Sequence, residues 1–134
     1  MHLRSSDLAA YALLGGSALL GLALWPSLPE RMAIHFGPSG NADNVVAKPL
    51  AIVLAPGVGV GSVLVTRYGP DWLTRNTSGP WMESLSVVFL AGVIAYVQVF
   101  LYAWNLGFDV SPSLAIAPVV VAACALVAYS FTRA

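Results

Sequence analysis

The chain of 134 residues is 58% hydrophobic and 9% charged, with six basic and six acidic side chains and therefore no formal net charge. Soluble domains are about one quarter charged, so these side chains are too few to cover a water-exposed surface of this size. The absence of net charge also gives no electrostatic basis for binding nucleic acid.

Four uncharged stretches set the predicted architecture. They run over Leu8–Pro29, Pro49–Thr66, Ser84–Phe108 and Val110–Thr132. Each is close to the roughly 20 apolar residues that a helix needs to cross the hydrocarbon core of a bilayer. The sequence therefore predicts an all-α, polytopic membrane protein that forms a single membrane domain. Its four transmembrane helices are expected at about 8–28, 49–68, 82–106 and 111–132, with an ordered loop cap at 29–48.

Aromatic residues at the ends of the stretches support these boundaries. Tryptophan and tyrosine prefer the headgroup zone, where the ring is in an apolar environment and one polar atom stays hydrated. The residues concerned are Trp25, Tyr68, Trp81, Trp104 and Tyr129. The first stretch is too long for the apolar core of a signal peptide, and no small-residue cleavage site follows it. We therefore expect it to be retained as a helix.

The distribution of Lys and Arg predicts the orientation in the plasma membrane. With four crossings, both termini and the second loop share one side, which carries Arg4, Arg67, Arg75 and Arg133. The opposite side carries Arg31 and Lys48. Because positive charge is enriched on the inner side, we expect both termini in the cytoplasm. The sequon that begins at Asn76 would also lie inside, and we interpret it as a turn.

The four stretches contain no charged side chain and no histidine. Proton relays and coupled transporters usually carry such groups within the bilayer, so a catalytic centre inside the membrane is not expected. The strongest polar residue in a span is Gln98, which we interpret as a hydrogen-bonding contact between helices. Pro56 and Pro118 are expected to kink the second and fourth helices. Cys124, the single cysteine, is interpreted as a small buried side chain.

Polar residues are concentrated in the segment between the first two spans. Pro26 and Pro29 predict the end of the first helix. Met32–Phe36 is short and apolar between helix breakers, so we expect an extended, strand-like piece on the membrane surface. Residues 37–44 read GPSGNADN and are rich in turn formers. Pro49 suits the first turn of the next helix.

The same segment resembles a known membrane family. Leu-Pro is followed by His-Phe, then by a Gly three residues before an Asp, then by a Lys five residues later. Here these residues are Leu28, Pro29, His35, Phe36, Gly40, Asp43 and Lys48. The pattern is similar to the domain of unknown function that forms the N-terminal membrane part of SdpI-type immunity proteins of bacteria. That domain also occurs in short stand-alone bacterial and archaeal proteins.

The resemblance implies an immunity or signalling function. SdpI-type proteins protect against a secreted toxic peptide, sense that peptide and hold a cytoplasmic repressor at the membrane. They carry a further C-terminal membrane part, so the determinants of repressor capture need not be present in this chain. Ala33, Gly37 and Asn44 depart from the pattern, because the family often has proline, asparagine and glycine at these positions.

Each polar residue of the motif has a structural and a functional interpretation. His35 is either a donor that fixes the loop through Asp43 or a carbonyl group, or a pH-sensitive ligand contact. Asp43 either accepts hydrogen bonds within its turn and pairs with Lys48 or His35, or contacts a ligand. Gly40 is expected to have a positive φ. Lys48 is expected to reach lipid phosphate or to pair with Asp43.

The remaining residues of the loop give no catalytic pattern. Met32 and Phe36 are interpreted as anchors that dip into the membrane. A single histidine together with Asp43 and Glu30 is too small a set for a typical zinc site, so no metal is expected. The sequence shows no nucleophile–base pair, no paired carboxylates and no phosphate loop, so we expect neither an enzyme nor a cofactor.

The sequence therefore predicts a non-enzymatic, SdpI-like membrane protein whose outer loop recognises a partner such as a toxic peptide. The expected partners are the lipid bilayer and a peptide or protein at that loop, and no nucleic acid. Small-residue pairs such as Gly57 and Gly61 leave open an accessory subunit of a larger membrane complex, as a homo- or hetero-oligomer. Pro56, the neighbouring glycines and Gln98 leave open a small channel or transporter.

Overall fold

The structure is a computed structural model that describes residues 4–74 and 79–132. Four of its helices are long and apolar enough to cross a membrane: α1 (Ser5–Ala23), α2 (Lys48–Tyr68), α4 (Pro80–Asn105) and α5 (Pro112–Thr132). The other elements are the 3₁₀ turn η1 (Trp25–Ser27), strands β1 (Arg31–Phe36) and β2 (Ala42–Ala47), and the short helix α3 (Asp71–Thr74). The prediction of a multi-pass membrane protein built on four helices is confirmed.

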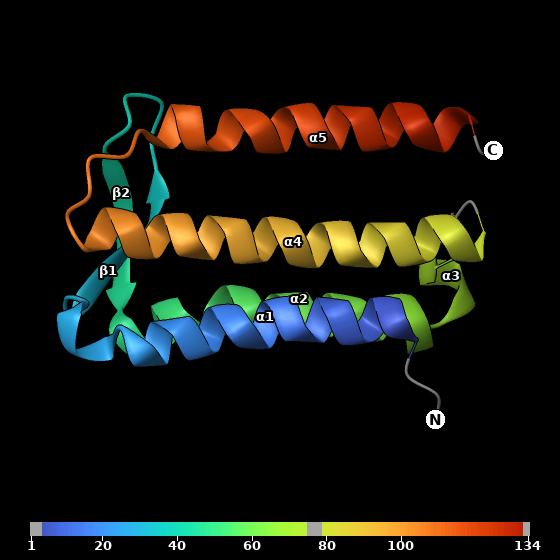
Figure 1. Ribbon diagram of the computed structural model, residues 1–134, viewed down its shortest axis with the longest axis horizontal. Coiled ribbons are helices and arrows are strands. Elements are labelled where there is room, and N and C mark those ends of the chain that lie inside the picture. Colours follow the sequence, from blue (N-terminus) through green and yellow to red (C-terminus); the bar gives the residue numbers. More distant parts are fainter. Residues whose placement is uncertain (1–3, 75–78, 133–134) are drawn as a thin grey trace.

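Figure 1 shows how these elements are arranged. Helices α1, α2 and α4 are neighbours, and α5 lies on the far side of α4. Strands β1 and β2 form a hairpin across one end of the bundle, which reaches from α1 and α2 to the start of α5. The start of α1 and the end of α5 lie at the opposite end, together with α3.

Prolines determine where several helices begin and end. Pro49 and Pro80 occupy the first turns of α2 and α4, where a missing backbone N–H removes no helical hydrogen bond. Pro26 lies in the 3₁₀ turn directly after α1. Helix α1 therefore ends at Ala23, earlier than predicted, and the apolar residues that follow form a turn.

Helices α1, α2 and α4 share the buried core. Its half near the termini consists of Ala10, Leu14, Val63, Val87 and Ala91, and its half near the hairpin of Leu28, Met32, Ala51, Ile52 and Tyr102. Gly59 allows α2 to approach α1, because a Cβ atom at this position would lie 2.6 Å from the Cδ2 atom of Leu14. The hairpin side chains in the second half join the loop cap to the bundle.

Gln98 links the three core helices. Its side chain is fully buried, and its Nε2 atom donates to the carbonyl oxygens of Ala51 at 2.9 Å and Ile52 at 3.3 Å. Nε2 also lies 3.0 Å from the Tyr102 hydroxyl, which donates to the carbonyl oxygen of Ser17 at 2.7 Å. The interpretation of Gln98 as a polar contact between helices agrees with these bonds.

Pro56 explains why α2 needs a donor from another helix. Proline has no backbone N–H, so Pro56 cannot donate to the carbonyl of Ile52 four residues earlier. A carbonyl without a donor is costly inside a bilayer, where water cannot replace the missing bond. Gln98 supplies that donor from α4.

Helix α5 is attached to the bundle much less than the other three. None of its described residues is buried. The Tyr96 hydroxyl donates to the carbonyl oxygen of Ala115 at 2.8 Å, and the Trp81 Nε1 atom donates to the Tyr129 hydroxyl at 3.1 Å. Cys124 lies on α5 and is exposed, so the prediction that it is buried is wrong. The reason is that most of the α5 surface faces away from the core.

Candidate binding site at the hairpin end

The segment between α1 and α2 folds into a β-hairpin. Strands β1 and β2 are antiparallel, with Met32 opposite Val46. The N–H of Gly37 donates to the carbonyl oxygen of Asn41 at 2.9 Å and closes the turn, in which Gly40 has the expected positive φ, at 85°. The sequence predicts the strand-like piece and the turn, but it does not predict the returning strand β2.

Side chains cover both outer edges of the hairpin. Asn105, at the end of α4, accepts from the N–H of Ala33 at 2.9 Å and donates to its carbonyl oxygen at 3.0 Å, as a neighbouring strand would. On the other edge, Nη2 of Arg31 donates to the carbonyl oxygen of Val45 at 3.1 Å. Open strand edges pair readily with other chains. One residue on each outer edge, Ala33 on β1 and Val45 on β2, is therefore already hydrogen-bonded to a side chain.

The hairpin packs on the helices through β1. Met32 is 1% exposed and belongs to the same buried cluster as Tyr102. The prediction that Met32 dips into the membrane is wrong, because its side of β1 faces the core. Phe36 packs edge-on against Phe100 and Trp104, with ring centroids 5.6 and 5.0 Å apart. These ring contacts fix the position of the hairpin relative to the end of α4.

His35 and Asp43 meet across the hairpin. The His35 Nδ1 atom lies 2.6 Å from Oδ1 of Asp43, and the two side chains are 69% and 49% exposed. Exposed ion pairs contribute at most about 1 kcal/mol, so this pair shapes the turn and leaves its polar atoms accessible. Within residues 4–74 and 79–132, no group of three or more His, Cys, Asp or Glu residues lies together as a metal site.

Lys48 has a different role from the two that we expected. It is buried, and its Nζ atom donates to the carbonyl oxygen of Trp25 at 2.9 Å and lies 4.8 Å from the centroid of the Trp25 ring. It does not pair with Asp43, because the two residues lie at opposite ends of β2. Leu28 is buried beneath the same region, whereas Pro29 is exposed. Lys48 and Leu28 therefore fix the base of the hairpin.

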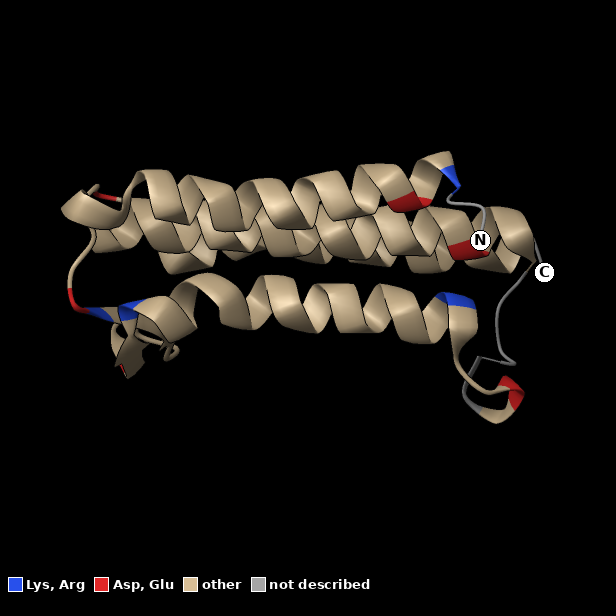
Figure 2. Ribbon diagram, turned by 90° about the horizontal axis from the view of Figure 1, so that it is seen from below, with Lys and Arg blue, Asp and Glu red and all other residues tan. Residues whose placement is uncertain are grey.

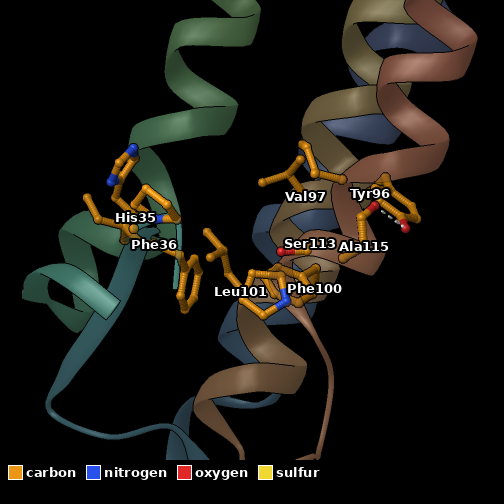
Figure 3. A pocket seen from close by; sticks show the side chains of 13 residues that line it. His35, Phe36, Tyr96, Val97, Phe100, Leu101, Ser113 and Ala115 are labelled. Carbon is orange, nitrogen blue, oxygen red and sulfur yellow. Dashed lines mark hydrogen bonds between the residues drawn. The ribbon is translucent and has the colours of Figure 1, made fainter. Parts of the chain in front are cut away.

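A cavity of about 320 Å³ lies between the hairpin, α4 and α5. Figure 3 shows that His35 and Phe36 approach it from the hairpin, Phe100 and Leu101 from α4, and Ala115 from α5. Its lining is mostly apolar, with His35, Tyr96 and Ser113 as polar members. The cavity brings two residues of the motif, His35 and Phe36, together with residues of α4 and α5 that the sequence does not single out.

A buried charged group, the Arg67 node, joins α1, α2 and α4 at the opposite end of the bundle. Arg67 donates from Nε to Asp7 and from Nη1 to Glu83, both at 2.8 Å. Its Nη2 atom lies 3.0 Å from the Ser6 hydroxyl oxygen and 3.1 Å from that of Ser84. The Arg67 and Asp7 side chains are 4% and 3% exposed. The helices therefore extend beyond the uncharged stretches and carry charged side chains at this end.

Figure 2 shows charged residues at both ends of the bundle and none along the middle of the helices. Sequence reasoning misses the Arg67 node because each member adjoins an uncharged stretch and is interpreted as its boundary. The available signal is the placement of two acids, Asp7 and Glu83, on the same predicted side as Arg67. The single positive charge of Arg67 holds both carboxylates in place, because guanidinium and carboxylate groups form strong directed bonds.

Comparison with known proteins finds a similarity over part of the chain. Residues 12–60 match the family model described as a domain of unknown function (DUF1648). The matched segment contains most of α1, the whole hairpin and the first half of α2, and it includes all seven motif residues from Leu28 to Lys48. No curated protein and no solved structure matches the chain. The hairpin and the adjoining parts of α1 and α2 are thus the region that is similar to this family model.

Proposed function

We propose that this protein is a non-enzymatic, SdpI-like receptor of the plasma membrane that recognises a partner such as a toxic peptide at its hairpin end. The observation that carries this proposal is the cavity between the hairpin, α4 and α5. Apolar side chains from three elements converge on about 320 Å³, beside the exposed pair of His35 and Asp43. Mostly apolar pockets with a few convergent polar groups are typical of ligand sites.

The position of the cavity suits a partner that arrives through the membrane. Helix α5 forms one wall and buries none of its described residues, so this side of the cavity adjoins lipid. An apolar segment in the bilayer can reach such a site without crossing water. Its polar groups can remain at the membrane surface, where His35 and Asp43 are accessible.

The motif resemblance is a second argument for the same function. The segment that matches the family model, residues 12–60, contains the motif from Leu28 to Lys48. That motif resembles the N-terminal part of SdpI-type immunity proteins, and the partner that we propose is the one that this resemblance implies, a secreted toxic peptide. In the orientation that we propose, with both termini in the cytoplasm, the hairpin faces outward. A peptide that attacks the membrane from outside would meet this end first.

A protection assay tests the proposal. Bacterial cells that produce the protein are exposed to a panel of membrane-active peptides, and survival is compared with that of cells lacking it. Ala115→Trp fills the cavity from α5, and Ala117→Trp is the matched control because Ala117 is exposed and lies outside the cavity lining. Native protein and Ala117→Trp should protect, whereas Ala115→Trp should not, at equal protein levels.

Two results of this assay would contradict the proposal. If both tryptophan variants protected equally, the cavity would not be the recognition site. If native protein protected against none of the peptides, the immunity function would be excluded for that panel. Immunoblots of the membrane fraction establish that the variants accumulate equally.

A second function, an accessory subunit of a larger membrane complex, is favoured by α5. A spanning helix that buries none of its described residues within its own bundle is free to pack against a helix of another protein. Purification in mild detergent distinguishes the two functions. A stoichiometric second protein supports the accessory function, and a monomer or homo-oligomer of this chain alone contradicts it.

A further inference from the structure

The chain segments around the mouth of the cavity carry negative charge. Residues 34–44 and 105–116 contain Asp43 and Asp109 and no Lys or Arg. Both aspartates are exposed. His35 adds a positive charge only when it is protonated. The formal charge of these segments is therefore −2 with His35 neutral and −1 with His35 protonated.

Asp43 is close in space to a lining residue of the cavity, and Asp109 is close to another along the chain. Asp43 is 2.6 Å from His35, which lines the cavity. Asp109 lies in the link between α4 and α5, three residues before Pro112, another lining residue. The hairpin turn adjoins this link, because a Cβ atom at Gly40 would lie 3.8 Å from Cδ of Pro112. The two carboxylates thus lie on two chain segments that meet at Pro112, beside the cavity; we call this region its mouth.

The basic residues of the hairpin end do not neutralise this mouth. Arg31 donates to the carbonyl oxygen of Val45 on the outer edge of β2. Lys48 is buried against Trp25. Both lie at the base of the hairpin, at the opposite end of its strands from the turn. The charge at the mouth therefore remains available to a partner.

We propose that the partner of this site is a cationic amphipathic peptide. This inference rests on the proposed function and specifies the chemistry of its partner. Apolar side chains of the peptide occupy the cavity, and its Lys or Arg side chains face Asp43 and Asp109. Complementary charge steers association and selects between partners that share the same apolar surface. An acidic peptide with identical apolar residues is repelled at the same mouth.

Binding to the purified full chain in phosphatidylcholine nanodiscs tests this inference, because this lipid carries no net charge. The probes are two labelled synthetic amphipathic peptides with the same leucine face, one with lysine and one with glutamate on the polar face. Binding is measured by fluorescence anisotropy against empty nanodiscs at low salt. The lysine peptide should bind at least about tenfold more tightly than the glutamate peptide, and the difference should shrink in high salt.

Charge variants test whether Asp43 and Asp109 cause the preference for the lysine peptide. Asp43→Asn and Asp109→Asn should each weaken binding of the lysine peptide by about 1.5- to fivefold, the range expected for an exposed charge pair. Asp71→Asn is the matched control, because Asp71 is an exposed acid at the opposite end of the bundle. Ala115→Trp should weaken the binding of both peptides, because it fills the space that the apolar side chains of either peptide would occupy.

The outcomes separate this inference from the proposed function. In one outcome, Ala115→Trp weakens the binding of both peptides, the two peptides bind native protein equally, and the two Asn variants leave both affinities unchanged. The cavity then binds peptides, but the charge inference is wrong. If neither peptide binds above empty nanodiscs, both proposals are wrong for peptide partners. A lysine preference that Asp71→Asn removes as effectively as Asp43→Asn would also overturn the inference, because net charge alone would then explain it.

Discussion

Replacing Gln98 with leucine removes the side chain that serves the carbonyl group left free by Pro56. The Nε2 atom of Gln98 lies 3.3 Å from the carbonyl oxygen of Ile52 and 2.9 Å from that of Ala51. Pro56→Ala would restore a backbone N–H that can donate to Ile52 within α2. The two substitutions are therefore expected to be coupled, because they act on the same acceptor.

The size of the coupling follows from the contacts of Gln98. A buried acceptor without a donor costs about 1–3 kcal/mol, and each hydrogen bond contributes about 0.5–1.5 kcal/mol. Gln98→Leu also removes the Oε1 atom, which is buried without a partner, and this gain offsets part of the loss. We expect Gln98→Leu to lower the free energy of unfolding by about 1–3 kcal/mol. With Pro56→Ala present, the same change should cost about 1–2 kcal/mol less.

A double-mutant cycle measures this coupling. Unfolding is followed by tryptophan fluorescence as sodium dodecyl sulfate replaces a mild detergent in mixed micelles. Pro118→Ala is the matched control, because Pro118 lies inside α5, which buries none of its described residues. Gln98→Leu and Pro118→Ala should be additive within about 0.5 kcal/mol. If Gln98→Leu and Pro56→Ala were additive within the same margin, the proposed link between Gln98 and Pro56 would be refuted.

Other contacts give predictions that can be measured singly. Arg67→Met should lower the free energy of unfolding by about 3–5 kcal/mol in the same micelles, because two carboxylates lose their buried counter-charge; a loss below about 1 kcal/mol would contradict this. Gly21→Ala should lower the thermal midpoint, because its methyl group would overlap the Tyr102 hydroxyl. Gly15→Ala meets nothing within 4 Å and should leave the midpoint unchanged or raise it, because alanine favours the helix. Equal midpoints would argue against the packing of α1 on α4. Ser39→Cys, in a chain whose native cysteine is changed to serine, should react with a membrane-impermeant maleimide on intact cells, because Ser39 is exposed in the hairpin turn; labelling only after lysis would reverse the orientation.

The long helices can be predicted from the sequence because a helix that crosses the hydrocarbon core must be about 20 residues long and nearly free of charged side chains. Helices α2, α4 and α5 begin at Lys48, Pro80 and Pro112, within two residues of the expected positions. The end of α1 is different, because the apolar residues after Ala23 belong to a turn around Pro26. Hydropathy measures transfer into lipid and does not distinguish a helix from an apolar turn.

The Arg67 node could not be predicted from charge gaps, because that method treats each charge as the end of a span. Helix α1 begins at Ser5 and includes Asp7, while α4 begins at Pro80 and includes Glu83. These carboxylates are tolerated inside the helices because Arg67 bonds both of them. The compensation is a contact between helices, and nothing in the sequence of one helix reveals it.

Strand β2 escapes prediction for a related reason. Its residues Ala42–Ala47 are exposed or only partly buried, so it has no buried face and no alternating pattern to detect. It is held by backbone pairing with β1, and β1 is held by Asn105, which is 72 residues away from Ala33 in the chain. The motif residues identify the loop correctly as an ordered element, but the walls of its cavity on α4 and α5 depend on tertiary packing.

The unequal attachment of the helices determines how the bundle can respond to a partner. Helices α1, α2 and α4 are joined by Arg67 at one end and by Gln98 nearer the other. Helix α5 buries none of its described residues. Segments with few buried contacts require the least free energy to move. If a partner fills the cavity as we propose, α5 is the wall that moves. The hydrogen bond from Trp81 of α4 to Tyr129 of α5 lies at the far end, near the termini, and this movement would lengthen or break it.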